Sequence, residues 1–76
     1  MRVLLVPNTN KPHALAASRE AAGFLVARGH EPVLVADDAI AAGLESHGVP
    51  LPDVMAVDLV VGFGGDGTIL KAVDLL

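Results

Sequence analysis

Three short apolar runs, rich in valine and leucine, constrain the fold of this chain more than any other feature of its sequence. They are Val3–Val6, Pro32–Ala36 and Leu59–Phe63, and none of them alternates polar with apolar residues. Continuous runs of this length are typical of strands that are buried on both faces, as in a parallel sheet. We therefore expect three parallel strands.

Helical patterns separate these runs. The first helix is predicted to begin near Pro12 and to end at Gly29. Its apolar residues recur at helical spacing: Leu15, Ala22, Leu25 and Val26. A second helix is predicted at about Asp38–Ser46, capped by Asp37 or Asp38. The segment "HGVPLPD" is expected to be a loop because of its two prolines, and a third helix is expected after the last strand.

The predicted element order is β-α-β-α-β-α, and right-handed crossovers would place helices on both faces of the sheet. This indicates an α/β fold of the Rossmann-like type, with three αβα layers and a parallel sheet. At 76 residues the layout would be incomplete. The ending "ILKAVDLL" resembles a helix still running where the chain stops, so residues 1–76 are expected to be one domain truncated at its C-terminal end.

The composition supports this expectation. The chain is 53% hydrophobic, although a domain of this size buries only about 60% of the surface that its unfolded chain exposes. Such a chain either oligomerises or is covered by the rest of a larger protein.

Charge and residue usage exclude several classes of function. The net charge of −4 and the lack of a basic run argue against a nucleic-acid partner. No apolar stretch approaches the roughly 18 residues of a membrane span, so no membrane partner is expected. The chain has no cysteine, and its three histidines lack metal-ligand spacing, so we expect no metal site of its own and a cytoplasmic location.

Ligands of parallel α/β sheets bind beyond the carboxyl ends of the strands, where three turns are candidates. In "VPNTNKP" the polar groups of Asn8, Thr9 and Asn10 either contact phosphate or ribose or merely form an Asx turn. In "VADDAI" an acid could bind ribose hydroxyls, but capping of the next helix explains Asp37 and Asp38 more simply.

The third turn, "GFGGDGTILK" (Gly62–Lys71), has four glycines within six residues at the end of a strand. Glycine permits positive φ and close ligand approach, and a following helix would offer a seat for phosphate. One interpretation is that Asp66 or Thr68 only caps that helix. The alternative is that Asp66 holds a divalent cation, or accepts or orients the proton of an attacking hydroxyl. A carboxylate beside a phosphate seat favours phosphorylation of a hydroxyl.

The motif "GGDGT" (Gly64–Thr68) after a hydrophobic strand resembles the signature of a kinase superfamily that includes NAD kinases and lipid kinases. The continuation "ILKA", the first turn with its Asn and Lys-Pro, and the alanine-rich helix are similar to NAD kinases. The resemblance covers nearly the whole chain. It implies the N-terminal nucleotide-binding domain of an enzyme that uses ATP, with a divalent cation such as Mg²⁺, to phosphorylate the 2′-hydroxyl of the adenosine ribose of NAD, giving NADP.

The resemblance also implies roles for single residues. Asp66 would be the proton acceptor or would orient the hydroxyl, and Asp66 and Gly67 would lie against NAD. Gly64, Gly65 and Thr68 would line the phosphate region. Lys71 would face NAD, and Asn8 would lie near the nucleotide.

Relatives of this kind have a second, largely β domain that this chain lacks, so the isolated chain is expected to be inactive. The full-length protein is expected to be a homo-oligomer. Two alternatives stay open from the sequence. One is the N-terminal domain of a diacylglycerol-type lipid kinase. The other is a non-catalytic module that binds nucleotide or a partner.

Overall fold

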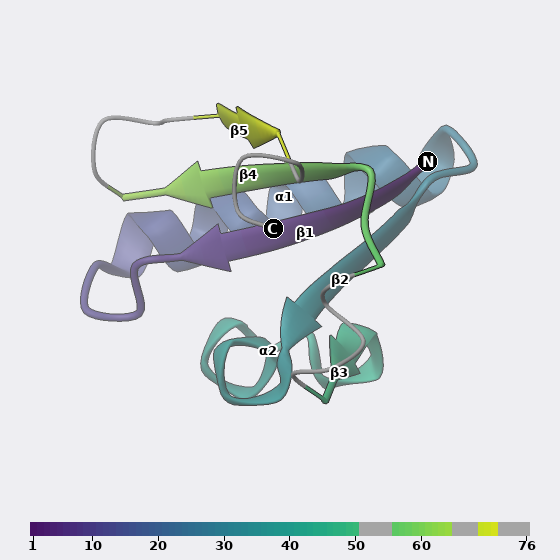
Figure 1. The fold of residues 1–76 in the computed structure, drawn as a ribbon. Helices are drawn as coiled ribbons and strands as arrows, with labels where there is room; N and C mark the ends of the chain where they lie inside the picture. The colour runs from purple at the N-terminus through teal and green to yellow at the C-terminus, as the bar shows by residue number, and fades with distance from the viewer. Residues whose placement is uncertain (51–55, 65–68, 72–76) are drawn as a thin grey trace.

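The computed structural model of the chain describes residues 1–50, 56–64 and, for the backbone alone, 69–71. Figure 1 shows the arrangement of its elements along the chain. The strands and helices are β1 (Arg2–Pro7), α1 (Pro12–Ala27), β2 (Glu31–Val35), α2 (Ala36–Ala42), the 3₁₀ helix η1 (Glu45–His47), β3 (Gly48–Val49), β4 (Leu59–Phe63) and β5 (Ile69–Lys71). Neither described helix has the length and hydrophobicity that crossing a membrane requires.

One sheet, with the strand order β3-β2-β1-β4-β5, organises the described residues. The first four strands in this order run parallel to their neighbours, and β5 runs antiparallel to β4. All three predicted strands are present, with ends within one residue of the expected ones. The α/β class and the parallel sheet are thus confirmed, in a layout that is incomplete.

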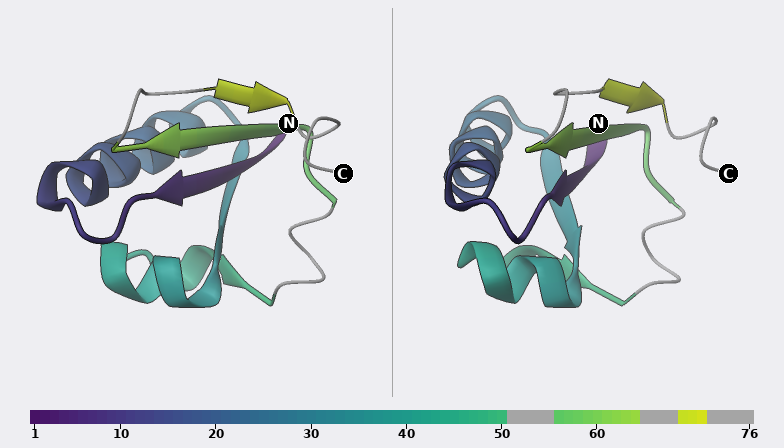
Figure 2. Two further views of the ribbon diagram at one scale, coloured as in Figure 1. Left: turned by 60° about the vertical axis from the view of Figure 1, so that its left-hand side comes forward. Right: turned by 90° about the vertical axis from the view of Figure 1, so that its left-hand side faces the viewer.

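Both described helices cover the same face of the sheet (Figure 2), whereas the sequence led us to expect helices on both faces. The strand order explains the difference. The chain moves in one direction along the sheet from β1 to β2 to β3, and crossovers of the same hand therefore place α1 and α2 on one face. The direction reverses only between β3 and β4, and Val57, just before β4, packs on the second face of the sheet.

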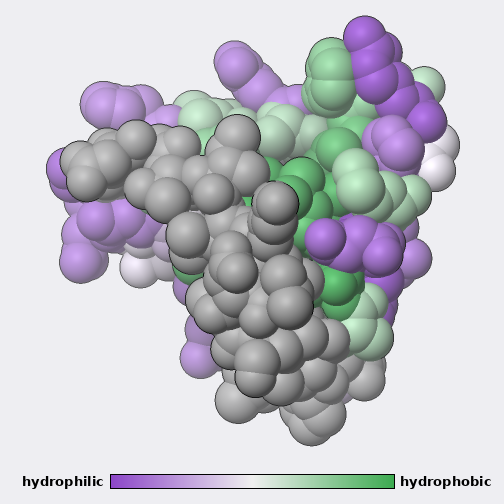
Figure 3. All heavy atoms as spheres, turned by 45° about the horizontal axis from the view of Figure 1, so that its top comes forward, coloured by the Kyte–Doolittle hydropathy of each residue, from purple (hydrophilic) through white to green (hydrophobic). Residues whose placement is uncertain are grey.

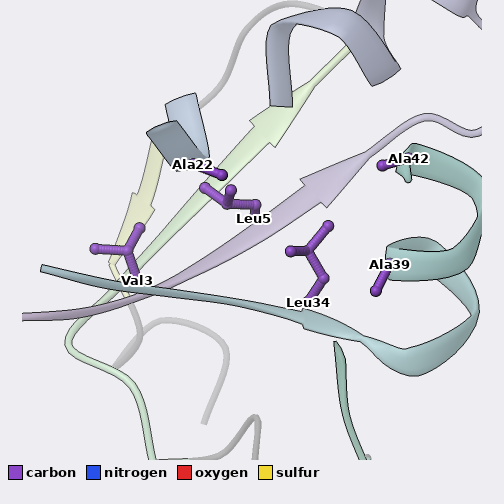
Figure 4. Close-up of a cluster of buried hydrophobic side chains, with 6 residues drawn as sticks. All are labelled: Val3, Leu5, Ala22, Leu34, Ala39 and Ala42. Carbon is purple, nitrogen blue, oxygen red and sulfur yellow. The ribbon is translucent and has the colours of Figure 1, made fainter. Parts of the chain in front are cut away.

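The core lies on both sides of the sheet, as the continuous apolar runs predict. On the helical side, buried side chains of β1 and β2 meet alanines of both helices (Figure 4): Val3, Leu5, Ala22, Leu34, Ala39 and Ala42. On the other side, Leu4, Val33 and Val60 form a second cluster, against which the partly buried Val57 packs. Alternate residues of one strand thus enter opposite layers. On the face shown in Figure 3, hydrophilic side chains gather near the rim and hydrophobic ones lie between them.

Helix α1 approaches the sheet through small side chains. Its buried residues are Ala14, Ser18 and Ala22, spaced four residues apart, and the Ser18 hydroxyl donates a hydrogen bond of 2.8 Å to the Leu15 carbonyl. The expectation that Val26 faces the core is wrong, because that side chain is 53% exposed. A stripe of small residues lets the helix backbone approach the strands closely, and this stripe rather than the larger apolar residues sets the buried face.

The second helix and the loop after it differ from the prediction. Helix α2 ends at Ala42 because Gly43 adopts the left-handed conformation, with φ 72°, and the Leu44 N–H donates to the Ala39 carbonyl over 2.8 Å. The expected loop contains β3, whose two residues pair with Leu34 and Val35. So short a strand leaves no pattern in a sequence, because its pairing partner lies on another element.

A third helix is expected from the sequence after the GGDGT motif, but residues Ile69–Lys71 form a strand, β5. This strand pairs with Leu59–Val61 of β4. Strand β4 pairs with β1 along one edge only, so its other edge would present unpaired backbone groups. Antiparallel pairing with β5 satisfies those groups, and this long-range gain outweighs the local helical pattern.

Candidate functional site

The carboxyl ends of β1 and β4 lie side by side at one edge of the sheet (Figure 1), and the turn after β1 starts there. Chain direction reverses between these two strands, because β2 and β3 lie on one side of β1 and β4 lies on the other. In open α/β sheets, the crevice at such a reversal is the usual place for a ligand. The strand order therefore selects the first and third turns as the two that meet at a ligand-binding position.

Asn8 holds the first turn in place. Its backbone N–H donates to the Phe63 carbonyl over 2.9 Å, which extends the β1–β4 ladder by one residue. Its side-chain Oδ1 accepts the N–H of Asn10 at 3.0 Å, and its carbonyl accepts the N–H of Lys11 at 3.0 Å. This is an Asx turn, one of the two interpretations that the sequence left open for this segment. The Asn8 side-chain NH₂ group makes no hydrogen bond to any described residue and remains exposed, so the same residue can both shape the turn and donate to a ligand.

Gly64 lies directly against this turn. Its φ of 90° is one that side chains disfavour, and a Cβ placed on it would lie 2.8 Å from the Asn8 Cβ and 2.6 Å from the Ala14 Cβ. Both neighbouring atoms are fixed to backbone, so neither could rotate away. Glycine at this position lets the end of β4 pass over the start of α1, where no side chain caps the helix.

The structure brings Asn8 and Gly64 together and separates Lys71 from them. Lys71 pairs with Leu59, the first residue of β4, at the opposite end of that strand from Gly64. Gly65, Asp66, Gly67 and Thr68 lie outside the described residues. The roles given to all these residues from the sequence stay predictions.

The second turn is built differently from the expected one. Asp37 and Asp38 do not cap α2, because they lie inside its first turn, and the capping position is Val35. The helix starts directly after β2 and leaves no loop in which an acid could cap it. No group of three or more potential metal-ligating side chains occurs among the described residues.

Burial, and secondarily the neighbouring charge of Asp37, raise the pKa of the Asp38 carboxyl above 3.8. The folded state then binds its proton more tightly than the unfolded state, so the contribution of Asp38 to stability falls as the pH rises through the raised pKa. We expect Asp38→Asn to raise the free energy of unfolding at neutral pH, by about 0.5 kcal/mol or less because the group is largely solvated. Urea unfolding at neutral and acidic pH would measure this, and the gain should vanish in acid. A loss of stability at neutral pH would instead show that the field of the α2 N-terminus dominates.

Sequence reasoning did not identify Ala14 as part of this site. It places a small side chain where Gly64 crosses the helix, and it is only 2% exposed. The available signal was an alanine in the first turn of a helix that follows a polar strand end, but alanines are common throughout both helices.

Comparison with known proteins identifies two curated relatives. The chain is 33% identical over 75 residues to an NAD kinase of Caldanaerobacter subterraneus subsp. tengcongensis. It is 37% identical over 82 aligned residues to an NAD kinase of Corynebacterium diphtheriae. Each alignment covers 97% of this chain and 26% of the relative, so the chain spans about a quarter of their length. No protein-family model matches the chain, and no solved structure matches it significantly.

Both alignments run through the first turn and through β4, the two parts of the chain that meet at the carboxyl edge. The chain is thus similar to NAD kinases along nearly its whole length, consistent with the N-terminal part of such an enzyme.

Proposed function

We propose that this chain forms the nucleotide-binding part of an NAD kinase, which transfers a phosphoryl group from ATP to the 2′-hydroxyl of the adenosine ribose of NAD. The observation that carries the proposal is the contact of Gly64 with Asn8 and Ala14 at the point where the strand order reverses. Gly64 is the first residue of the GGDGT motif. The two curated relatives that are similar to this chain are NAD kinases.

The residues at this edge suit a phosphorylated ligand. The Asn8 NH₂ group is a donor, and the missing Cβ at Gly64 lets the end of β4 lie directly against Asn8. Asp66 follows Gly64 by two residues, so the covalent chain keeps its Cα within about 7 Å of the Gly64 Cα. In the proposed reaction Gly64, Gly65 and Thr68 line the phosphate region, and Asp66 and Gly67 contact NAD.

The chemistry required of these residues is limited. Protein groups in phosphoryl transfer mainly position the reactants and neutralise charge. Asp66 would orient the 2′-hydroxyl and accept its proton as the oxygen attacks the terminal phosphorus of ATP and ADP leaves. Mg²⁺ commonly binds through substrate phosphates and water rather than through a protein cage. A cation carried by ATP is therefore compatible with the described residues, which hold no cluster of metal ligands.

The test is an assay of the full-length protein with ATP and Mg²⁺ and either NAD or diacylglycerol. We expect NADP to form, detected by an NADP-specific dehydrogenase, and no phosphatidic acid. Phosphatidic acid without NADP would replace this proposal with the lipid kinase. If neither product forms but calorimetry shows that ATP or NAD binds, the chain belongs to a non-catalytic nucleotide-binding protein.

A further inference from the structure

The hydrophobic pattern of β4 does not by itself fix how this strand pairs with β1. Its sequence is Leu-Val-Val-Gly-Phe, without polar residues on either face. A slip of one residue normally moves an apolar set to the solvent face and is therefore costly. Here such a slip would bring Leu59 or Val61 into the layer that Val60 occupies and would move Val60 into the opposite apolar layer, so no polar side chain would change layers.

The close contact at Asn8 does not choose the register alone either. In the observed pairing Phe63 lies opposite Pro7, and Gly64 therefore reaches Asn8. Gly62 and Gly65 also lack a Cβ. A slip of two residues in one direction, or of one residue in the other, would again bring a glycine to Asn8.

At the other end of β4, Asp58 and Arg2 form a reciprocal pair of hydrogen bonds that is possible in only one register of β4 on β1. The Asp58 N–H donates to the Arg2 carbonyl over 2.8 Å, and the Arg2 N–H donates to the Asp58 Oδ2 over 2.8 Å. The second bond is charge-assisted and therefore stronger than a neutral one. A slip in either direction would replace Asp58 with Val57 or Leu59, neither of which has a side-chain acceptor.

Arg2 is itself anchored to other parts of this edge. Its Nη1 donates to the Ala56 carbonyl over 3.2 Å, and its Nε lies 3.4 Å from Oε2 of Glu31 on β2. Asp58 is thus hydrogen-bonded to Arg2, which also contacts the segment before β4 and strand β2. These contacts fix the position of the amino-terminal end of β4 relative to β1 and β2.

We infer that Asp58 is a positioning residue that fixes the register of β4 on β1 and thereby sets the start of the GGDGT motif against Asn8. Its effect on catalysis rests on the proposed function, whereas its effect on register does not. Asp58 lies at the opposite end of β4 from Gly64, so it acts through the strand and not by contact with a substrate.

The test compares Asp58→Ala, Asp58→Asn and Glu31→Gln in the full-length protein by amide hydrogen exchange and cross-strand nuclear Overhauser effects. Glu31→Gln is the matched control, because it weakens an ion pair of Arg2 without touching β4. Asp58→Ala should raise exchange of the Asn8 amide roughly tenfold relative to the Leu34 amide, as loss of one charge-assisted bond predicts. Asp58→Ala should also weaken the nuclear Overhauser effects between Leu5 and Val61, which are partners in the native register.

Asp58→Asn retains an acceptor oxygen and should raise the exchange rate of the Asn8 amide only about two- to threefold, again relative to the Leu34 amide. This variant decides the question if Asp58→Ala does not fold. The inference is overturned if exchange at Asn8 is unchanged, or if it rises only in parallel with Leu34, which would indicate a general loss of stability. NADP formation by the wild-type protein is measured separately. If the wild type forms no NADP while Asp58→Ala still changes exchange at Asn8 selectively, the proposed function alone is rejected and the inference on register stands.

Discussion

Replacing Gly64 with alanine is expected to destabilise the fold by about 2–6 kcal/mol, a large part of the stability of a typical small domain. Two costs add. The φ of 90° at Gly64 is unfavourable for any residue with a Cβ, at about 1–3 kcal/mol. The new methyl group would also overlap the Cβ atoms of Asn8 and Ala14, which forces backbone shifts that cost another 1–3 kcal/mol or so.

Gly29→Ala is the matched control for this experiment. Gly29 has a φ of 79°, but a Cβ added there would meet nothing within 4 Å. It should therefore cost only the conformational part, about 1 kcal/mol. Urea unfolding of both variants measures the difference, which isolates the crowding at Asn8 and Ala14. Equal losses for the two variants would contradict the close approach that defines the candidate site.

A second variant keeps the test informative if Gly64→Ala does not fold. Ala14→Gly removes the nearer of the two overlapping atoms, although glycine near a helix start costs up to about 1 kcal/mol by itself. Combined with Gly64→Ala, it should recover part of the lost stability. A double-mutant cycle then gives a favourable coupling between positions 14 and 64, whereas independent sites would give none.

The strands and the first helix could be predicted from the sequence because their signals are local. A run such as Leu59–Phe63 has the composition of a strand buried on both faces wherever it lies in the sheet. Pro12 and Gly29 bound α1 through backbone restrictions of single residues. The chain therefore shows its class from short stretches alone.

Pairing between distant segments was the part that the sequence did not show. Strand β3 has only two residues, and β5 exists because β4 has an open edge. The same limit applies to the site. Both the first turn and the GGDGT motif were recognisable as candidates. Only the strand order shows that β1 and β4 are neighbours and that Asn8 meets Gly64. Asp58 carries no motif at all, and its position opposite Arg2 depends on register.

Asp66→Asn in the full-length protein is expected to lower kcat for NADP formation about 10²- to 10⁴-fold, the usual contribution of a general base. Asparagine has the same shape and can still hydrogen-bond to the 2′-hydroxyl, but it does not take up the proton at neutral pH. The KM for NAD should change much less than kcat, because the variant removes an interaction that strengthens in the transition state. Steady-state assays over a range of NAD concentrations separate the two quantities.

Glu20→Gln is the control for the loss of one negative charge, since Glu20 is exposed on α1 and should leave both kinetic constants unchanged. The register of β4 should also be native in Asp66→Asn, because the Asp58–Arg2 pair remains intact. A normal cross-strand pattern combined with low kcat would therefore assign the defect to the missing carboxylate and not to a displaced turn. NADP formation at the wild-type rate would rule out Asp66 as the proton acceptor. A large rise in KM with kcat unchanged would limit its role to binding NAD.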